Sequence, residues 1–160
     1  AGLLDKKVGG YIWTFENYKL VFNHTSEDAT TYESNRRALY LPVIRNHVYS
    51  LFELFDFPDP GTVNGNRTNS TIAPQALFLM NSPLILRTTE AMTQQILADK
   101  KLTNSQGVER LYVKVYKRSP TARELKRAEA FVSNFAKDRQ AGWQALCQSL
   151  VSSNEFLYVK

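Results

Sequence analysis

The chain has 160 residues, of which 43% are hydrophobic and 22% are charged, with a formal net charge of +5 at pH 7. These values exclude wholesale disorder, and the length suits one domain that buries a core without disulfides. No apolar run is long enough to span a membrane, so the sequence predicts a soluble chain. One cysteine and two distant histidines offer no haem-attachment or zinc motif, and we expect no cofactor and no metal.

The first third of the chain is irregular. Aromatic residues alternate with other residues between Tyr11 and Phe22, which permits a short β-hairpin. Residues 23–35 are polar and rich in threonine and serine, which predicts a surface loop. Pro42 disfavours a helix interior because it lacks a backbone donor, so residues 36–45 predict an extended stretch.

Helical spacing of apolar residues begins after this stretch. It predicts a helix over 46–55, which the proline-rich run 56–61 must end, and a loop over 61–71. A short helix follows over 73–80. Ser82 then suits an N-cap with Pro83 in the first turn, which predicts a helix reaching about Lys100.

Three further amphipathic patterns complete the chain. Apolar residues recur at helical spacing from Val108 to Tyr116 and again from Trp143 to Val151. Between them, Thr121 and Glu124 form a capping-box pattern that starts a helix running to about Lys137. We expect the final segment, 154–158, to dock on the core through its three large apolar side chains.

Together these elements predict an all-α fold, an orthogonal bundle of five or six helices. Residues 1–35 form the irregular N-terminal arm and residues 36–160 the helical domain, within a single domain overall. Cys147 falls on the apolar face of its helix, where a thiol behaves as a small hydrophobic group.

Positive charge is concentrated between Lys100 and Arg127. Nine basic residues stand there against Glu109 and Glu124, a net charge of +7. Such a block is typical of a solvated helical face, and it also suits contact with an acidic partner, a polysaccharide or nucleic acid. The candidate basic face consists of Arg110, Lys114, Lys117 and Arg118.

A second group of polar residues lies near predicted turns and helix ends. Two of its carboxylates, with an arginine to bind an anion, would suit a hydrolase or lyase that acts on polysaccharide. The same residue types also cap turns and satisfy loop backbone, and we favour that structural interpretation. The group consists of Arg36, Arg37, Arg45, Asp56, Asp59, Arg67, Gln75 and Asn81.

The order of several short motifs over about Leu3 to Tyr158 resembles a planctomycete-type domain of unknown function. The motifs are residues 36–40, 55–56 with 58–59, 67–71, 74–77, 81–83, 116–121 with Glu124, and 154–158. Members of that family usually carry glycine where this chain has Lys117.

The resemblance implies the C-terminal part of a larger exported bacterial protein, and therefore an extracytoplasmic location. Such proteins commonly carry a planctomycete cytochrome c domain upstream, so haem would belong to that part and the upstream domains would be the partners. The family brings no established active site. We therefore expect a non-catalytic structural or interaction module, with the polysaccharide-acting enzyme as the alternative and nucleic-acid binding as a weaker one.

Overall fold

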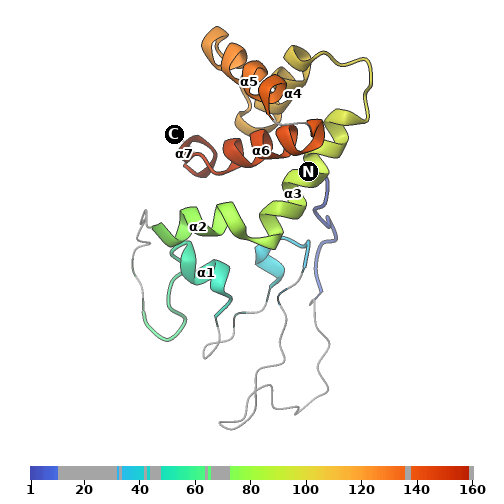
Figure 1. Ribbon diagram of the computed structural model, residues 1–160. Helices are drawn as coiled ribbons and strands as arrows, with labels where there is room; N and C mark the ends of the chain where they lie inside the picture. The colour runs from blue at the N-terminus through green and yellow to red at the C-terminus, as the bar shows by residue number, and fades with distance from the viewer. Residues whose placement is uncertain are drawn as a thin grey trace. The chain divides into compact units, whose positions relative to one another are not determined.

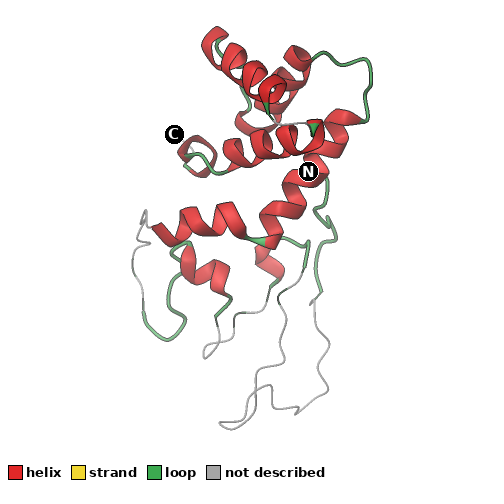
Figure 2. Ribbon diagram, viewed as in Figure 1, coloured by secondary structure: helices red, strands yellow, loops and turns green. Residues whose placement is uncertain are grey.

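The structure is a computed structural model that describes residues 1–10, 32, 34–41, 43, 48–63, 65, 73–135 and 138–158. The chain divides into two compact units, one of Ala1–Gly2 with Ile72–Lys160 and one of Leu3–Thr71. The regular structure of the described residues is helical, with seven α-helices, one 3-10 helix and no strand (Figures 1 and 2). This confirms the predicted all-α class, whereas the boundary between residues 35 and 36 stays a prediction.

The larger unit is built around its sixth helix. Helix α6 contacts each of the other helices of the unit, as Figure 1 shows. These helices are α2 (Ala73–Asn81), α3 (Pro83–Leu97), α4 (Asn104–Tyr116), α5 (Ala122–Asn134), α6 (Arg139–Val151) and α7 (Asn154–Leu157). None of the described helices has both the length and the apolar character needed to cross a membrane.

The core of this unit follows the predicted apolar stripes. The side chains of Val108, Leu111, Trp143 and Cys147 are at most 1% exposed. They are joined by Met92, Tyr112, Ala128, Val132, Leu146, Leu150 and Val151 in one hydrophobic cluster. The helical periodicity therefore identified the faces that α4, α5 and α6 bury.

Side-chain caps start the helices where the sequence predicts them. Ser82 Oγ accepts a hydrogen bond from the Leu84 amide at 3.2 Å, and Thr121 forms the predicted capping box with Glu124. A second capping box, of Thr103 with Gln106, starts α4. This capping box was not among the predictions, although its Thr-x-x-Gln pattern is present in the sequence.

Several predicted boundaries are wrong. Helix α3 ends at Leu97 rather than near Lys100, and α5 ends at Asn134 because Phe135 is extended. The segment 154–158 folds as α7 against α4 and α6, but Phe156 and Tyr158 remain 43% and 40% exposed. A four-residue helix presents too little surface to bury three large side chains.

The smaller unit contains the 3-10 helix η1 (Ala38–Tyr40) and α1 (Ser50–Leu54). Helix α1 is shorter than predicted because Tyr49 is not helical, with φ −56° and ψ 125°. The Tyr49 ring stacks on that of Tyr32 at a centroid distance of 4.6 Å. The predicted hairpin between Tyr11 and Phe22 lies outside the described residues, as do Pro42 and most of the predicted loops over 23–35 and 61–71.

Candidate functional site

A groove of about 790 Å³ runs along the exposed face of α4. Helix α4 contributes residues at helical spacing, and the chain before and after the helix supplies the rest. The residues that line this α4 groove are Asp99, Lys101, Leu102, Gln106, Glu109, Arg110, Val113, Lys114, Lys117 and Ser119. Three of the four residues of the predicted basic face therefore line one groove.

The positive charges of the α4 groove are unequally neutralised. Arg110 Nη1 lies 3.2 Å from Asp99 Oδ2, and both side chains are largely exposed, at 63% and 40%. An exposed ion pair of this kind adds little stability. It does offset the charge of Arg110 at the N-terminal end of the groove, where Glu109 adds a second carboxylate.

At the other end, Lys114 and Lys117 have only neutral partners. Lys114 Nζ donates to Gln95 Oε1, and Lys117 Nζ donates to the Lys114 carbonyl at 3.3 Å. Within the part of the chain that the structure describes, no ion pair involves either lysine. This end of the groove therefore presents two uncompensated positive charges.

Lys117 also ends α4 in a left-handed conformation, with φ 60° and ψ 21°. Glycine is the residue that adopts this conformation without steric cost from a Cβ. The glycine that the resemblance places at this position is therefore explained by the backbone. In this chain Lys117 adopts the left-handed backbone despite its Cβ, and its side chain adds a positive charge to the groove.

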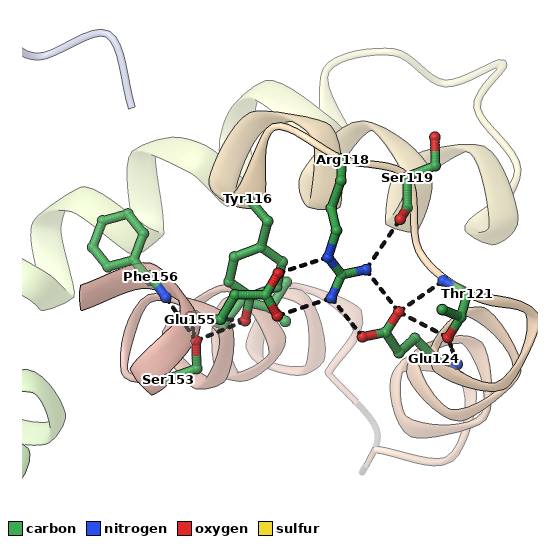
Figure 3. A network of polar contacts seen from close by, with 9 residues as sticks. Tyr116, Arg118, Ser119, Thr121, Glu124, Ser153, Glu155 and Phe156 are labelled. Atoms are coloured by element: carbon green, nitrogen blue, oxygen red, sulfur yellow. Dashed lines mark hydrogen bonds and ion pairs between the residues drawn. The ribbon is translucent and has the colours of Figure 1, made fainter. Parts of the chain in front are cut away.

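Arg118, the fourth residue of the predicted basic face, has a different environment. Its guanidinium group pairs with Glu124 at the start of α5 and with Glu155 in α7 (Figure 3). Nε and Nη2 donate to the Glu155 carboxylate at 2.6 and 2.8 Å, and Nη1 and Nη2 donate to that of Glu124 at 2.9 and 2.8 Å. Nη1 also donates to the Ser119 carbonyl at 3.1 Å, so all five N–H groups have an acceptor.

These contacts join the segment that follows α4 to α5 and to α7. Glu124 Oε2 accepts hydrogen bonds from the Thr121 amide and hydroxyl at 2.7 and 2.8 Å, which places its charge in the first turn of α5. The bonds from Arg118 and then from Thr121 lower the pKa of Glu124 from 4.5 to about 2. The two carboxylates in turn raise the pKa of Arg118. We call Arg118, Glu124 and Glu155 the Arg118 network, and its geometry is that of a structural joint.

Tyr116 connects the same region to α6. Its hydroxyl donates to the Leu150 carbonyl at 3.1 Å and lies 2.9 Å from Ser153 Oγ, the N-cap of α7 (Figure 3). Burial raises the pKa of the Tyr116 hydroxyl above its ordinary value of 10. The end of α4 is therefore held firmly beside the groove.

The second predicted group of polar residues is divided between the two units. In the smaller unit, Arg36 donates to the carbonyls of Lys7, Gly9 and Gly10 at 2.7 to 3.0 Å, and its guanidinium stacks on Tyr40. Arg36 thereby holds the chain segment 7–10 in place. Arg37 is the exposed residue before η1.

The two aspartates of that group lie at a turn. Asp59 Oδ1 accepts a hydrogen bond from the Gly61 amide at 2.7 Å, and Asp56 has a left-handed backbone with φ 57°. Both geometries are typical of turn residues. Arg45 and Arg67 lie outside the described residues, so the structure does not show the cluster that the hydrolase hypothesis needs.

The remaining two members belong to α2. Gln75 is 4% exposed, and Asn81 Nδ2 donates to the Leu77 carbonyl of its own helix at 3.0 Å. Cys147 is fully buried as expected, and burial raises the pKa of its thiol. Among the described residues no three histidine, cysteine, aspartate or glutamate side chains are grouped to hold a metal ion.

The sequence predicted only three of the ten residues that line the α4 groove as site residues, namely Arg110, Lys114 and Lys117. Four of the other lining residues are Lys101, Gln106, Val113 and Ser119. Gln106 and Val113 share the helical register of Arg110 and Lys117, a signal that was available in the sequence. Lys101 and Ser119 lie outside α4, and their positions depend on how the flanking loops fold.

Comparison with known proteins identifies a family for most of the chain. Residues 1–132 match PSD1, described as a protein of unknown function (DUF1553). Searches of curated proteins and of solved structures found no match. The matched segment includes all of α4 and ends within α5. It therefore contains every residue that lines the α4 groove. The chain belongs to the PSD1 (DUF1553) family of proteins of unknown function.

Proposed function

We propose that this chain is a non-catalytic interaction module that binds an anionic partner in the α4 groove. One observation carries the proposal: Lys114 and Lys117 present two positive charges in a groove, and no carboxylate offsets them among the described residues. An anion about 4 Å from one such charge gains roughly 1 kcal/mol in water, and more where water is displaced.

The rigidity of the surroundings supports the same proposal. The Arg118 network and the Tyr116 hydroxyl fix the end of α4, so the lysines project from an ordered helix. A surface that is ordered before binding loses less conformational entropy when the partner binds. This arrangement suits recognition better than a flexible basic tail would.

The resemblance to exported planctomycete-type proteins supports a context for the module. In that context the chain is the C-terminal part of a larger extracytoplasmic protein. Its partners are then the upstream domains of the same polypeptide, including a cytochrome c domain that would carry the haem, or an acidic polymer outside the cell.

Binding of fluorescein-labelled polyglutamate, followed by fluorescence anisotropy, tests the proposed function. We expect salt-dependent binding, weakened roughly tenfold or more in the double variant Lys114→Glu/Lys117→Glu. The matched control is Arg123→Glu/Lys126→Glu, which makes the same change in net charge at exposed positions of α5. Equal loss in both variants would show that net charge, and not the groove, binds the anion.

A further inference from the structure

The α4 groove is asymmetric in charge along the helix. Toward the N-terminal end of α4, Lys101 and Arg110 are balanced by Asp99 and Glu109. Toward the C-terminal end, the charged residues that line the groove are Lys114 and Lys117, both cations. A partner with evenly spaced negative charges would therefore meet repulsion at one end and attraction at the other.

An apolar surface lies next to the positive end. Val113 is 48% exposed although it is an aliphatic residue, and it lines the groove beside Lys114 and Lys117. Among the described lining residues there is no aromatic ring. The groove therefore offers aliphatic contact beside its two lysines and no platform on which nucleic-acid bases could stack.

We propose that the partner is a peptide segment that carries an aliphatic side chain followed closely by clustered carboxylates. The aliphatic side chain covers Val113, and the carboxylates pair with Lys114 and Lys117. This inference rests on the proposed function, because it requires the α4 groove to be the binding surface. It goes further in naming the chemical class of the partner and the direction in which it lies.

The spacing within the peptide follows from helix geometry. Lys117, the C-cap of α4, follows Val113 by four positions, and four residues span about 6 Å along a helix axis. An extended peptide advances about 3.3 Å per residue, and its alternate side chains point to the same face. An aliphatic residue and a glutamate two positions later would therefore reach Val113 and Lys117 together.

Nucleic acid fits the α4 groove less well. DNA carries phosphates at regular intervals along its backbone, so a strand that reached Lys114 and Lys117 would also approach Asp99 and Glu109. Like-charge contacts of this kind weaken binding. A peptide can place its carboxylates at one end only.

The test compares three labelled probes with the full chain. The first is a short peptide with one leucine and two glutamates at alternate positions, the second replaces the leucine with serine, and the third is a single-stranded oligodeoxynucleotide. The variants are Lys114→Glu/Lys117→Glu, the α5 control Arg123→Glu/Lys126→Glu, and Val113→Thr, which keeps the β-branched shape and replaces one methyl group with a hydroxyl. Circular dichroism melting confirms that each variant folds.

We expect the leucine peptide to bind more tightly than the serine peptide and the oligonucleotide. Val113→Thr should weaken the leucine peptide about fourfold and leave the serine peptide unchanged, since it removes only the aliphatic contact. The lysine double variant should weaken both peptides roughly tenfold.

Two other outcomes overturn the inference in distinguishable ways. If the oligonucleotide binds best, or if both peptides bind equally and Val113→Thr has no effect, the groove binds anions but the partner class is wrong. If the lysine double variant binds every probe as the α5 control does, the inference and the proposed function both fail.

Discussion

Gly107 of α4 lies directly against the indole ring of Trp143 in α6. A Cβ atom on Gly107 would stand 2.6 Å from Cη2 and 3.1 Å from Cζ2 of Trp143, and 3.4 Å from Cγ2 of Ile96. Trp143 is only 1% exposed, so its ring is enclosed by the core. The absence of a side chain at Gly107 therefore sets how closely these two helices approach.

We expect Gly107→Ala to destabilise the fold by up to about 2 kcal/mol. Alanine favours a helix over glycine by about 1 kcal/mol, but overpacking a rigid core costs about 1 to 3 kcal/mol. Urea unfolding followed by circular dichroism measures the difference, with Ser105→Ala in the same helix as the control. A stability gain in Gly107→Ala would show that the indole shifts easily and that the close approach is not a constraint.

Lys117→Gly should stabilise the chain. The left-handed backbone of Lys117 costs a residue with a Cβ about 1 kcal/mol relative to glycine. We expect Tm to rise by about 2 to 4 °C, measured by thermal denaturation. Lys117→Ala removes the same charge but keeps a Cβ, and it should show no such rise; an equal rise in both variants would assign the effect to charge instead.

Protonation of Glu124 should weaken the fold in acid. Because the pKa of Glu124 is about 2 in the folded chain and 4.5 is its ordinary value, its contribution is fully present above pH 4.5. That contribution is lost progressively as the pH falls from about 4.5 to 2. The stability difference between the unmodified chain and Glu124→Gln should therefore shrink over this range.

Urea unfolding at a series of pH values measures this dependence. The matched control is Glu129→Gln, the same substitution at another position of α5. Glu129 accepts none of the five N–H groups of Arg118, which are all directed to other acceptors. A difference between the unmodified chain and Glu124→Gln that stays constant down to pH 2 would contradict the role given to the Arg118 network.

The thiol of Cys147 should be unreactive in the folded chain. It is fully buried, burial raises its pKa, and the Thr93 hydroxyl lies 3.6 Å from its sulfur. We expect a thiol reagent such as DTNB to label it only on the timescale of unfolding, and urea to make labelling fast. Because the chain has a single cysteine, rapid labelling without denaturant would show that α6 opens within the folded state.

The sequence by itself determined the helical class, the buried faces and part of the capping. Val108, Leu111 and Trp143 follow the helical period, and Thr121 and Glu124 are three residues apart, so local spacing is enough to predict both features. The basic face on α4 was predictable for the same reason, since Arg110, Lys114 and Lys117 lie near one another on a single helix.

Only the tertiary structure decided what each of these groups contacts. Arg118 directly follows Lys117, the C-cap of α4, yet it pairs with Glu155, which is 37 positions away in the sequence. Arg118 does not line the α4 groove although its neighbours Lys117 and Ser119 do, and the close contact of Gly107 with Trp143 depends on how α4 meets α6. Such pairings form between helices that are distant in sequence, and periodicity within one helix carries no information about the partner that another helix supplies.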